Sequence, residues 1–408
     1  MPSPRVRILL RVLGLLAFPF ALWRIIPENY DDAARRVADA GRVAVGFDLG
    51  QSYATSVAHF SNGTVVSLPK IPGSEDYIAF MARMNNQPPS FLPDGYVNQR
   101  PSRPQLLQDL WTLFMRSIGL PPSKDAAVLV RMKVALKAAS EVALGHAIDS
   151  AAVTAPWRAS WQHEVPSLGI VNTALLLAGI TPVALEDNDT LYMGEINSLL
   201  AAHKRKLCPA IWCADHFGSD AGEPQPINFL ISFTNQSLHT SFQVTRCFFL
   251  DSWSNDFGTI DSRYGLDKLM HMGPERREDF WTSIHDHLVE RVTKYLGRHS
   301  PHPRVPFLAL VAGEASDTPE FRTVLQEVTE SVARLRVADA RSQGEPEGTD
   351  IRPMELLIAD DPTFAAARGA AFWMRMQLDW SYCEDCFASR PGEYVSQYDM
   401  LSESHVEL

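Results

Sequence analysis

The chain has 408 residues, of which 46% are hydrophobic and 21% are charged, with 37 Lys and Arg against 48 Asp and Glu. That length and apolar fraction suffice for one large two-lobed domain or for roughly two to three ordinary domains. The composition excludes collagen, coiled-coil fibres, small disulfide-dense proteins and disordered chains. A net charge of −11 argues against a nucleic-acid-binding surface, which needs a basic face, so we expect no nucleic-acid partner.

Residues 1–41 are expected to be a hydrophobic targeting segment followed by a short charged helix. Four arginines and no acid occur up to residue 27, and the apolar run lies within residues 8–26. This pattern is typical of a signal anchor, and no clean small-residue cleavage site follows it. The run is short for a membrane-spanning helix. We expect a membrane contact through residues 8–26 in the secretory pathway or endoplasmic reticulum; the alternatives are a mitochondrial presequence or a buried helix.

Two further features bear on this localisation. Glycosylation sequons begin at Asn62, Asn188 and Asn235, and they agree with a secretory route, although Asn62 and Gly63 also predict a hairpin turn. From residue 381 to residue 408 there are six acids and a single arginine. A like-charged terminal stretch of this kind predicts a solvated, disordered acidic tail.

The body of the chain begins with β-rich sequence. Short strands are predicted at residues 43–49, 55–60 and 64–68, with turns at 50–52 and 61–63. Asp48 lies at the end of the first strand and is followed by a Gly turn with a hydroxyl side chain. The N–H groups of such a turn can hold phosphate oxygens, and the carboxylate can hold a hydrated Mg²⁺. An ordinary hairpin with a capping Asp explains this fragment equally well.

Helices and strands then alternate, which is typical of an α/β protein. In the first half, the predicted elements are helix 126–142, strand 151–155, helix 167–178 and strand 182–185. A second sheet is predicted further on, from strands 227–233 and 240–250, helix 278–295, strand 307–313, helix 319–337, strand 355–359 and helix 362–378.

Five segments, taken in order and at this spacing, resemble the nucleotide-binding domain of the heat-shock protein 70 family: GFDLGQSYATSVAHFSNG, VLVRMKVALKAASEVALGHAIDSAAVTAPW, LLLAGITPVALEDNDTLYMGE, FLALVAGEASDTPEF and DDPTFAAARGAAF. The resemblance covers residues 42–378 and is most specific over 128–157. It implies a two-lobed actin-like ATPase fold of class α/β, with ribonuclease H-like mixed sheets flanked by helices. Lobe I would cover residues 42–226 and lobe II residues 227–380.

The resemblance also implies a nucleotide cleft between the lobes, with ATP or ADP and Mg as cofactors. Asp48 falls where the family holds Mg through water. The residues similar to the first phosphate loop are Asp48, Gly50, Gln51, Ser52 and Tyr53. Gln51 departs from the family, which usually has Thr at this position.

Three more positions match the family's cleft. Glu186 falls where the family has an acid that helps to order water and metal, so Asp48 and Glu186 are the catalytic candidates if the site is active. Gly313 and Glu314 match the adenosine loop, although Ala312 replaces one glycine of the expected pair.

The second phosphate loop departs most from the family. The family has Asp-x-Gly-Gly-Gly-Thr, whereas residues 232–237 of this chain read SFTNQS. Glycine lets the backbone approach phosphates closely and adopt φ > 0, so three side-chained residues obstruct both. We expect this loop not to grip ATP in the family's manner, unless the side chains of Asn235 and Gln236 act as substitute donors.

Other parts of the family's pattern are reduced or missing. Only residues 258–277 occupy the place of a whole second-lobe subdomain. No counterpart of the family's peptide-binding domain follows residue 378, and no lysine matches the one that assists hydrolysis. We therefore do not expect a chaperone of the standard kind.

Three functions remain open on these grounds. The first is a weak or non-hydrolysing ATP binder that acts as an interaction or regulatory module with an unknown protein partner. The second is a residual Mg-dependent ATPase that uses Asp48, Glu186, Asn235 and Gln236. The third is a pseudo-ATPase scaffold without nucleotide. An open cleft favours binding, and a cleft filled by side chains favours the scaffold.

Overall fold

The structure is a computed structural model that describes residues 42–85, 103–156, 161, 168–182, 192–203, 226–244, 256–344, 346 and 351–378. The expected targeting segment, residues 1–41, and the acidic tail, residues 381–408, lie outside these ranges, as do Glu186 and Asn188. Among the described residues, no helix combines the length and the hydropathy that crossing a bilayer requires.

The first sheet follows the order β3-β2-β1-β5-β6, with β4 beside β2 and β7 beside β5. Its strands are β1 (Ala44–Leu49), β2 (Tyr53–His59), β3 (Val65–Ser67), β4 (Ile71–Pro72), β5 (Ser150–Ala155), β6 (Thr181–Pro182) and β7 (Met193–Gly194). The first three strands run antiparallel, and β5 lies parallel to β1 on its other side. The predicted turn at Asn62 and Gly63 joins β2 to β3, and Gly63 has a φ of +83° there.

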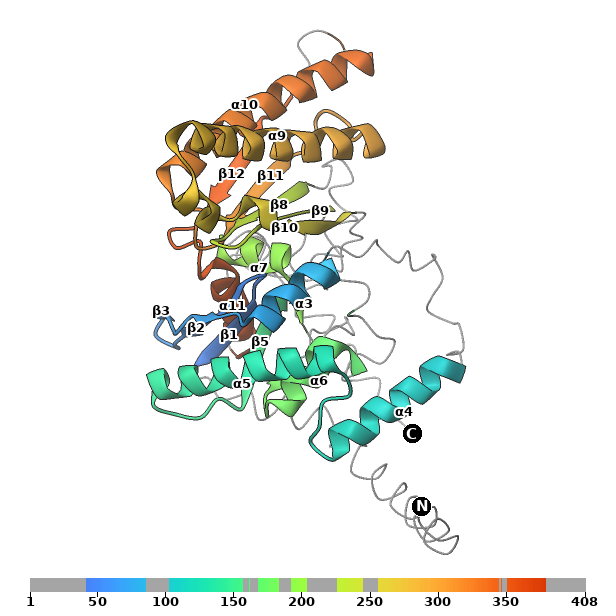
Figure 1. The fold of residues 1–408 in the computed structure, drawn as a ribbon, viewed down its shortest axis with the longest axis vertical. Coiled ribbons are helices and arrows are strands. Elements are labelled where there is room, and N and C mark those ends of the chain that lie inside the picture. Colours follow the sequence, from blue (N-terminus) through green and yellow to red (C-terminus); the bar gives the residue numbers. More distant parts are fainter. Residues whose placement is uncertain are drawn as a thin grey trace, which may run out of the picture.

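The second sheet follows the order β10-β9-β8-β11-β12 (Figure 1). Its strands are β8 (Ile227–Phe233), β9 (Leu238–Val244), β10 (Asp256–Asp261), β11 (Phe307–Ala312) and β12 (Met354–Ile358). Three antiparallel strands are again followed by two parallel ones. Both sheets therefore repeat one strand order and one pattern of directions, and the prediction of two ribonuclease H-like mixed sheets in an actin-like, two-lobed fold is confirmed.

The reduced second-lobe subdomain is also confirmed. Between β10 and the next long helix the chain forms only two short 3₁₀ helices, η4 (Ser262–Tyr264) and η5 (Leu266–His271). Asp261 caps η4 by accepting a hydrogen bond from the backbone N–H of Arg263. The connection is thus a tight surface segment that packs beside β9, with no separate core of its own among the described residues.

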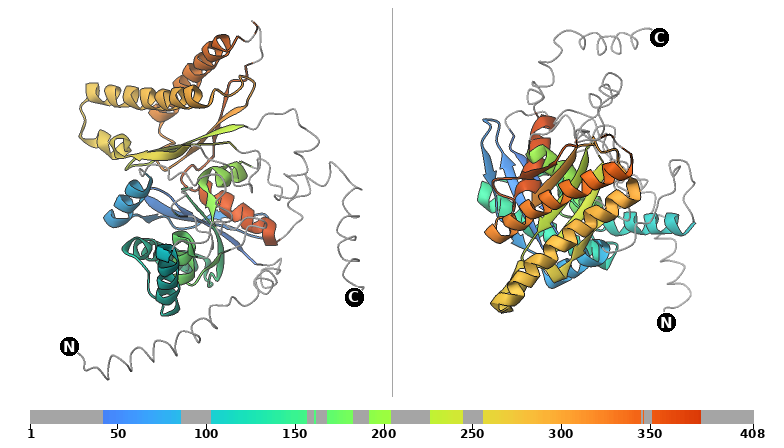
Figure 2. Two further views of the ribbon diagram at one scale, coloured as in Figure 1. Left: turned by 90° about the vertical axis from the view of Figure 1, so that its right-hand side faces the viewer. Right: turned by 90° about the horizontal axis from the view of Figure 1, so that it is seen from above.

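Helices cover the outer faces of both sheets, and other helices lie between the two sheets (Figures 1 and 2). The helices of the first lobe are α3 (Glu75–Asn85), α4 (Arg103–Ser117), α5 (Lys124–Leu144), α6 (Ile170–Leu177) and α7 (Glu195–Ala202). Those of the later sequence are α9 (Pro274–His299), α10 (Pro319–Ser342) and α11 (Ala365–Leu378). One core joins α5 and α6 to the first sheet, and a second joins α9 and α10 to the second sheet.

A third, smaller core lies between the lobes. It packs Leu199 and Leu200 of α7 against Leu230 and Leu310 of the second sheet, together with Ala365 and Ala366 of α11. The helix α11 also packs on β1, β2 and β5 of the first sheet. By its contacts α11 belongs with the first lobe, although the expected boundary at residue 227 places it in the second.

Candidate functional site

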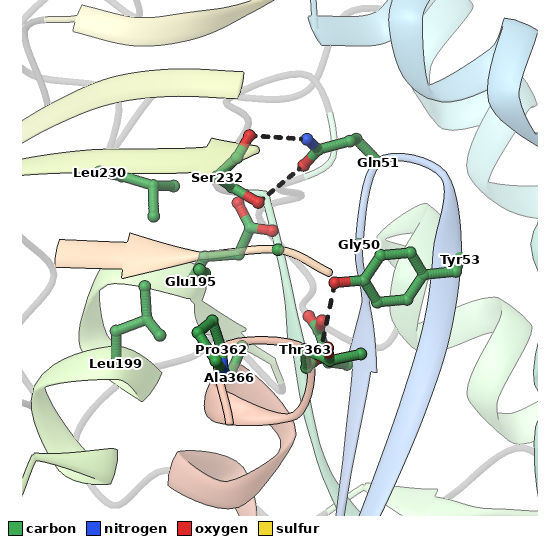
Figure 3. Close-up of a pocket in the computed structure, with 13 residues that line it drawn as sticks. Gly50, Gln51, Tyr53, Glu195, Leu199, Leu230, Ser232, Pro362, Thr363 and Ala366 are labelled. Carbon is green, nitrogen blue, oxygen red and sulfur yellow. Dashed lines mark hydrogen bonds between the residues drawn. The ribbon is translucent and has the colours of Figure 1, made fainter. Parts of the chain in front are cut away.

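A small cavity lies where the two sheets meet (Figure 3). Asp48 and Tyr53 line it from the first sheet, Ser232 and Gly313 from the second, and Glu195 from the start of α7. The volume of the cavity, measured as the space open to the centre of a water-sized sphere, is about 10 Å³. By the same measure, this is close to the volume that one bound water needs. It is far smaller than a typical small-molecule pocket of several hundred Å³. Side chains therefore fill most of the cleft.

Two carboxylates face this cavity. Asp48 is 5% exposed near the end of β1, and Glu195 is 5% exposed at the first residue of α7. Burial and, after it, the charge of Glu195 raise the pKa of Asp48 well above its ordinary range. The Oδ1 atom of Asp48 has no hydrogen-bond partner in the described structure. Ionisation of Asp48 is therefore costly in the closed cleft.

Glu195 is the acid that the sequence analysis missed. Glu186, the predicted acid, lies outside the described residues; among those described, Glu195 lines the cavity with Asp48. The local sequence explains the position: β7 ends at Gly194, and Glu195 opens a helix whose N-terminal dipole favours a carboxylate. A Glu directly before the apolar helical sequence INSLLAA was the signal that could have identified it.

Gln51 joins the two loops that match the family's phosphate loops. Its side chain is 1% exposed, and its Nε2 donates to the backbone oxygen of Ser232 at 2.9 Å. In return, the hydroxyl of Ser232 donates to Oε1 of Gln51 at 3.2 Å (Figure 3). Gln51 lies in the β1–β2 turn and Ser232 at the end of β8, so this paired contact crosses from one lobe to the other. The buried amide of Gln51 is thus hydrogen-bonded through both its nitrogen and its oxygen to the other lobe.

The backbone N–H groups of the turn between β8 and β9 already donate to acceptors within the protein. The N–H of Thr234 donates to the oxygen of Ser237, and the N–H groups of Gln236 and Ser237 donate to the hydroxyl oxygen of Thr234. The N–H of Asn235 donates to the carboxylate of Glu314 at 3.3 Å. Each N–H from Thr234 to Ser237 thus has a protein acceptor, and none points freely toward an anion.

A second interlobe contact involves the adenosine-loop position. Lys70, which precedes β4, forms an ion pair with Glu314, which follows β11. The ammonium of Lys70 also lies 5.1 Å from the ring centre of Tyr53. Gly313 has a φ of +100°, and a Cβ there would lie 2.1 Å from the oxygen of Phe233. Glycine is therefore required at 313 by backbone packing within the second lobe, whatever the cleft contains.

The third interlobe contact is buried. Nδ1 of His239, on β9, lies 3.1 Å from Oε2 of Glu195, and both side chains are at most 6% exposed. This separation is short enough for an ion pair, although no well-directed hydrogen bond joins the two atoms. His239 therefore brings a titratable group of the second lobe to the carboxylate pair of the first.

The predicted site residues divide into two groups. Asp48, Gly50, Gln51, Tyr53 and Gly313 line the cavity. The others do not: Ser52 is buried beside it, Glu314 pairs with Lys70, and Asn235 lies in the β8–β9 turn. The side-chain amide of Gln236 donates to Asp267 at 2.6 Å on the exposed side of that turn. The amide of Gln236 is thus engaged outside the cavity rather than aimed at a phosphate.

The donor set fits a divalent cation better than a nucleotide. Carboxylate oxygens are the ligands that Mg²⁺ prefers, so Asp48 and Glu195 are the residues that would hold such an ion. The phosphates, in contrast, would need both the space that Gln51 fills and the N–H groups that the β8–β9 turn already uses. The chemistry available in the closed cleft is therefore proton or cation binding by two acids, without a cradle for the phosphates.

Comparisons with known proteins found a similar solved structure but no matching family. No protein-family model matches the sequence, and no curated protein matches it. Among solved structures, the chain is similar to the ethanolamine utilization protein EutJ from Carboxydothermus hydrogenoformans, at 10% sequence identity and a TM-score of 0.38. The alignment covers 81% of this chain and 90% of that one. The fold assignment rests on the strand order of the two sheets rather than on this likeness.

Proposed function

We propose that this chain is a degenerate actin-like ATPase domain of the heat-shock protein 70 type that keeps its lobes closed without nucleotide. In this proposal it acts as a non-catalytic interaction or regulatory module. The observation that carries the proposal is the paired hydrogen bond between Gln51 and Ser232. It occupies the meeting point of the two loops that a phosphate chain would have to separate.

Two further interlobe contacts support the same proposal. Lys70 with Glu314 and His239 with Glu195 also join the two lobes. Together with the hydrogen bonds between Gln51 and Ser232, these two pairs connect the two lobes at three positions along the cleft. Closure is therefore built from protein groups, so bound nucleotide is not needed to stabilise the closed state.

Equilibrium dialysis of labelled ATP against the full chain, with Mg²⁺ present, tests the proposal. We expect no binding at about millimolar nucleotide and no release of phosphate, because the phosphate position is filled. Asp48→Ala and Asp76→Ala serve as matched variants, since Asp48 lines the cavity whereas the side chain of Asp76 is 77% exposed. Binding that is lost in Asp48→Ala and kept in Asp76→Ala would contradict the proposal.

One observation favours a second candidate function, residual binding of Mg·ATP. Asp48 and Glu195 face one small cavity, and Oδ1 of Asp48 has no partner there. An opened cleft would expose both carboxylates to a cation and its bound phosphates. The dialysis separates the two candidates, because only the second predicts ATP binding that depends on Asp48.

A further inference from the structure

The helix α4 presents apolar side chains to solvent along one side. Leu107 is 68% exposed, Ile118 just beyond the helix is 51% exposed, and three others are exposed by about half. We call the following residues the α4 outer face: Leu106, Leu107, Trp111, Phe114 and Ile118. Four of them recur at spacings of three or four residues, so they lie on one side of the helix. Figure 1 and the right-hand view of Figure 2 show α4 projecting from the body of the molecule.

The polar side of α4 is the one that faces the protein. Thr112 is buried, whereas Gln105, Asp109 and Arg116 are each partly buried and engaged in interactions. Burial lowers the pKa of the Arg116 guanidinium. An ordinary surface helix has the opposite arrangement, with its apolar side on the core. The apolar side of α4 is therefore the side that is left exposed to solvent.

The composition of the outer face fits the surface of a bilayer. It combines Leu, Ile, Phe and Trp and carries no charged side chain, as do helices that lie in the interface plane. Trp is suited to this depth because its ring is apolar while its N–H is polar. In α4 the indole N–H of Trp111 already donates to the oxygen of Pro122 at 3.0 Å. With only 15 residues, α4 is too short to span a bilayer and would lie along it.

Charge and chain length agree with a bilayer as the occupant. Residues 103–124 contain three basic residues and one acid, whereas the whole chain has a net charge of −11. This local excess favours an anionic lipid surface over contact with a second acidic copy. Residues 27–41 separate the apolar run 8–26 from the described domain and can reach up to about 50 Å when extended. That reach is comparable to the width of a domain of this size.

We propose that the α4 outer face lies on the bilayer that residues 8–26 enter, with α4 parallel to the membrane plane. The apolar side chains insert among the lipid headgroups and upper acyl chains. The inference rests on the expected membrane anchor and not on the state of the cleft. It assigns the partner of this face to the lipid class rather than to a protein.

Quenching of tryptophan emission by brominated lipids tests the proposal. The full chain is reconstituted into vesicles of phosphatidylcholine and phosphatidylserine whose acyl chains carry bromine. The part of the quenching that disappears in Trp111→Phe reports the depth of Trp111, since every other tryptophan is common to both proteins. We expect a clear Trp111-dependent share. We expect its loss in a Leu107→Gln, Phe114→Gln double variant, which retains Trp111 but weakens insertion.

A matched control variant tests whether the loss of exposed apolar side chains outside α4 has the same effect. Val142 and Met270 are 84% and 70% exposed and lie outside α4, so Val142→Gln with Met270→Gln removes two exposed apolar side chains elsewhere. This control is expected to keep the Trp111-dependent quenching. The proposal would be overturned if the Trp111-dependent quenching were equal in the outer-face variant and in the control. It would also be overturned if vesicles isolated by flotation carried none of the protein. A chain that is dimeric in solution and becomes monomeric in the outer-face variant without any quenching of Trp111 would overturn it as well.

Discussion

Asp48 is the side chain in the cleft whose ionisation most directly opposes folding. It is buried at the end of β1, and both burial and the nearby charge of Glu195 raise its pKa. One pKa unit corresponds to about 1.4 kcal/mol of difference between the two protonation states. The charged form of Asp48 is therefore disfavoured in the closed cleft, so its ionisation lowers the free energy of unfolding as pH rises.

Asp48→Asn is predicted to stabilise the chain at about pH 8 and to change its stability little at about pH 4. Because its folded pKa is raised, Asp48 in the folded chain keeps a proton that the unfolded chain loses above about pH 3.9. The free energy of unfolding of the natural chain therefore falls as pH rises through this range, and Asn lacks this contribution. Urea unfolding at both pH values measures the difference.

The matched variant for this experiment is Asp76→Asn, whose side chain is 77% exposed. It removes only an exposed ion pair with Arg131, so it should change stability by no more than about 1 kcal/mol at either pH. If Asp48→Asn proved destabilising at about pH 8, the buried carboxylate would have a stabilising partner that the closed cleft does not show, such as a bound cation.

Single residues also mark the limit of what the sequence could predict. The position of Asp48 at the end of a buried strand was readable from the strand pattern. The role of Gln51 was not, because its partner Ser232 lies 181 residues away and the contact exists only when the lobes meet. A bulky amide in a phosphate loop is compatible with either donating to a ligand or replacing one.

At the scale of elements, α7 and α11 pack against each other between the two sheets. The two helices touch so closely at Gly369 that a Cβ there would lie 1.7 Å from the backbone oxygen of Ser198. Because the atoms that such a Cβ would meet belong to the backbone of Ser198, no side chain can move aside to make room. Gly369 therefore sets the distance between the helices and, through α7, the position of Glu195.

Gly369→Ala is predicted to destabilise the chain by about 1–3 kcal/mol or more, because the helices must move apart. Gly297→Ala is the matched control: Gly297 lies in α9 with open space at its Cβ position. That change should be neutral or stabilise by up to about 1 kcal/mol, since Ala favours helix over Gly. Denaturant midpoints followed by circular dichroism measure both, and equal losses in the two variants would contradict the packing argument.

The elements differed in how well the sequence predicted them. Strands β1, β8 and β11 are buried apolar runs, and α5 and α10 carry apolar residues at helical spacing, so their positions were predicted closely. The short helix α7 was missed. It is buried on most of its residues and therefore lacks the polar face that marks an amphipathic helix.

At the scale of the whole molecule, the two-lobed fold with two mixed sheets was predicted through the family resemblance, and the state of the cleft was not. The alternation of strands and helices alone indicates only an α/β protein. The contacts that join the lobes across the cleft pair residues far apart in sequence, such as Gln51 with Ser232, Lys70 with Glu314 and Glu195 with His239. None of these pairs leaves a local signal.

The measurement that tests the central claim most directly is the thermal unfolding midpoint of the full chain with and without Mg·ATP. A ligand that binds only the folded state adds about 2.7 kcal/mol of stability at a hundred times its Kd, which is readily seen as a raised midpoint. A cleft closed by Gln51, Glu314 and His239 predicts the same midpoint at about millimolar Mg·ATP as without it. A raised midpoint that disappears in Asp48→Ala would show that nucleotide enters the cleft and would contradict the account.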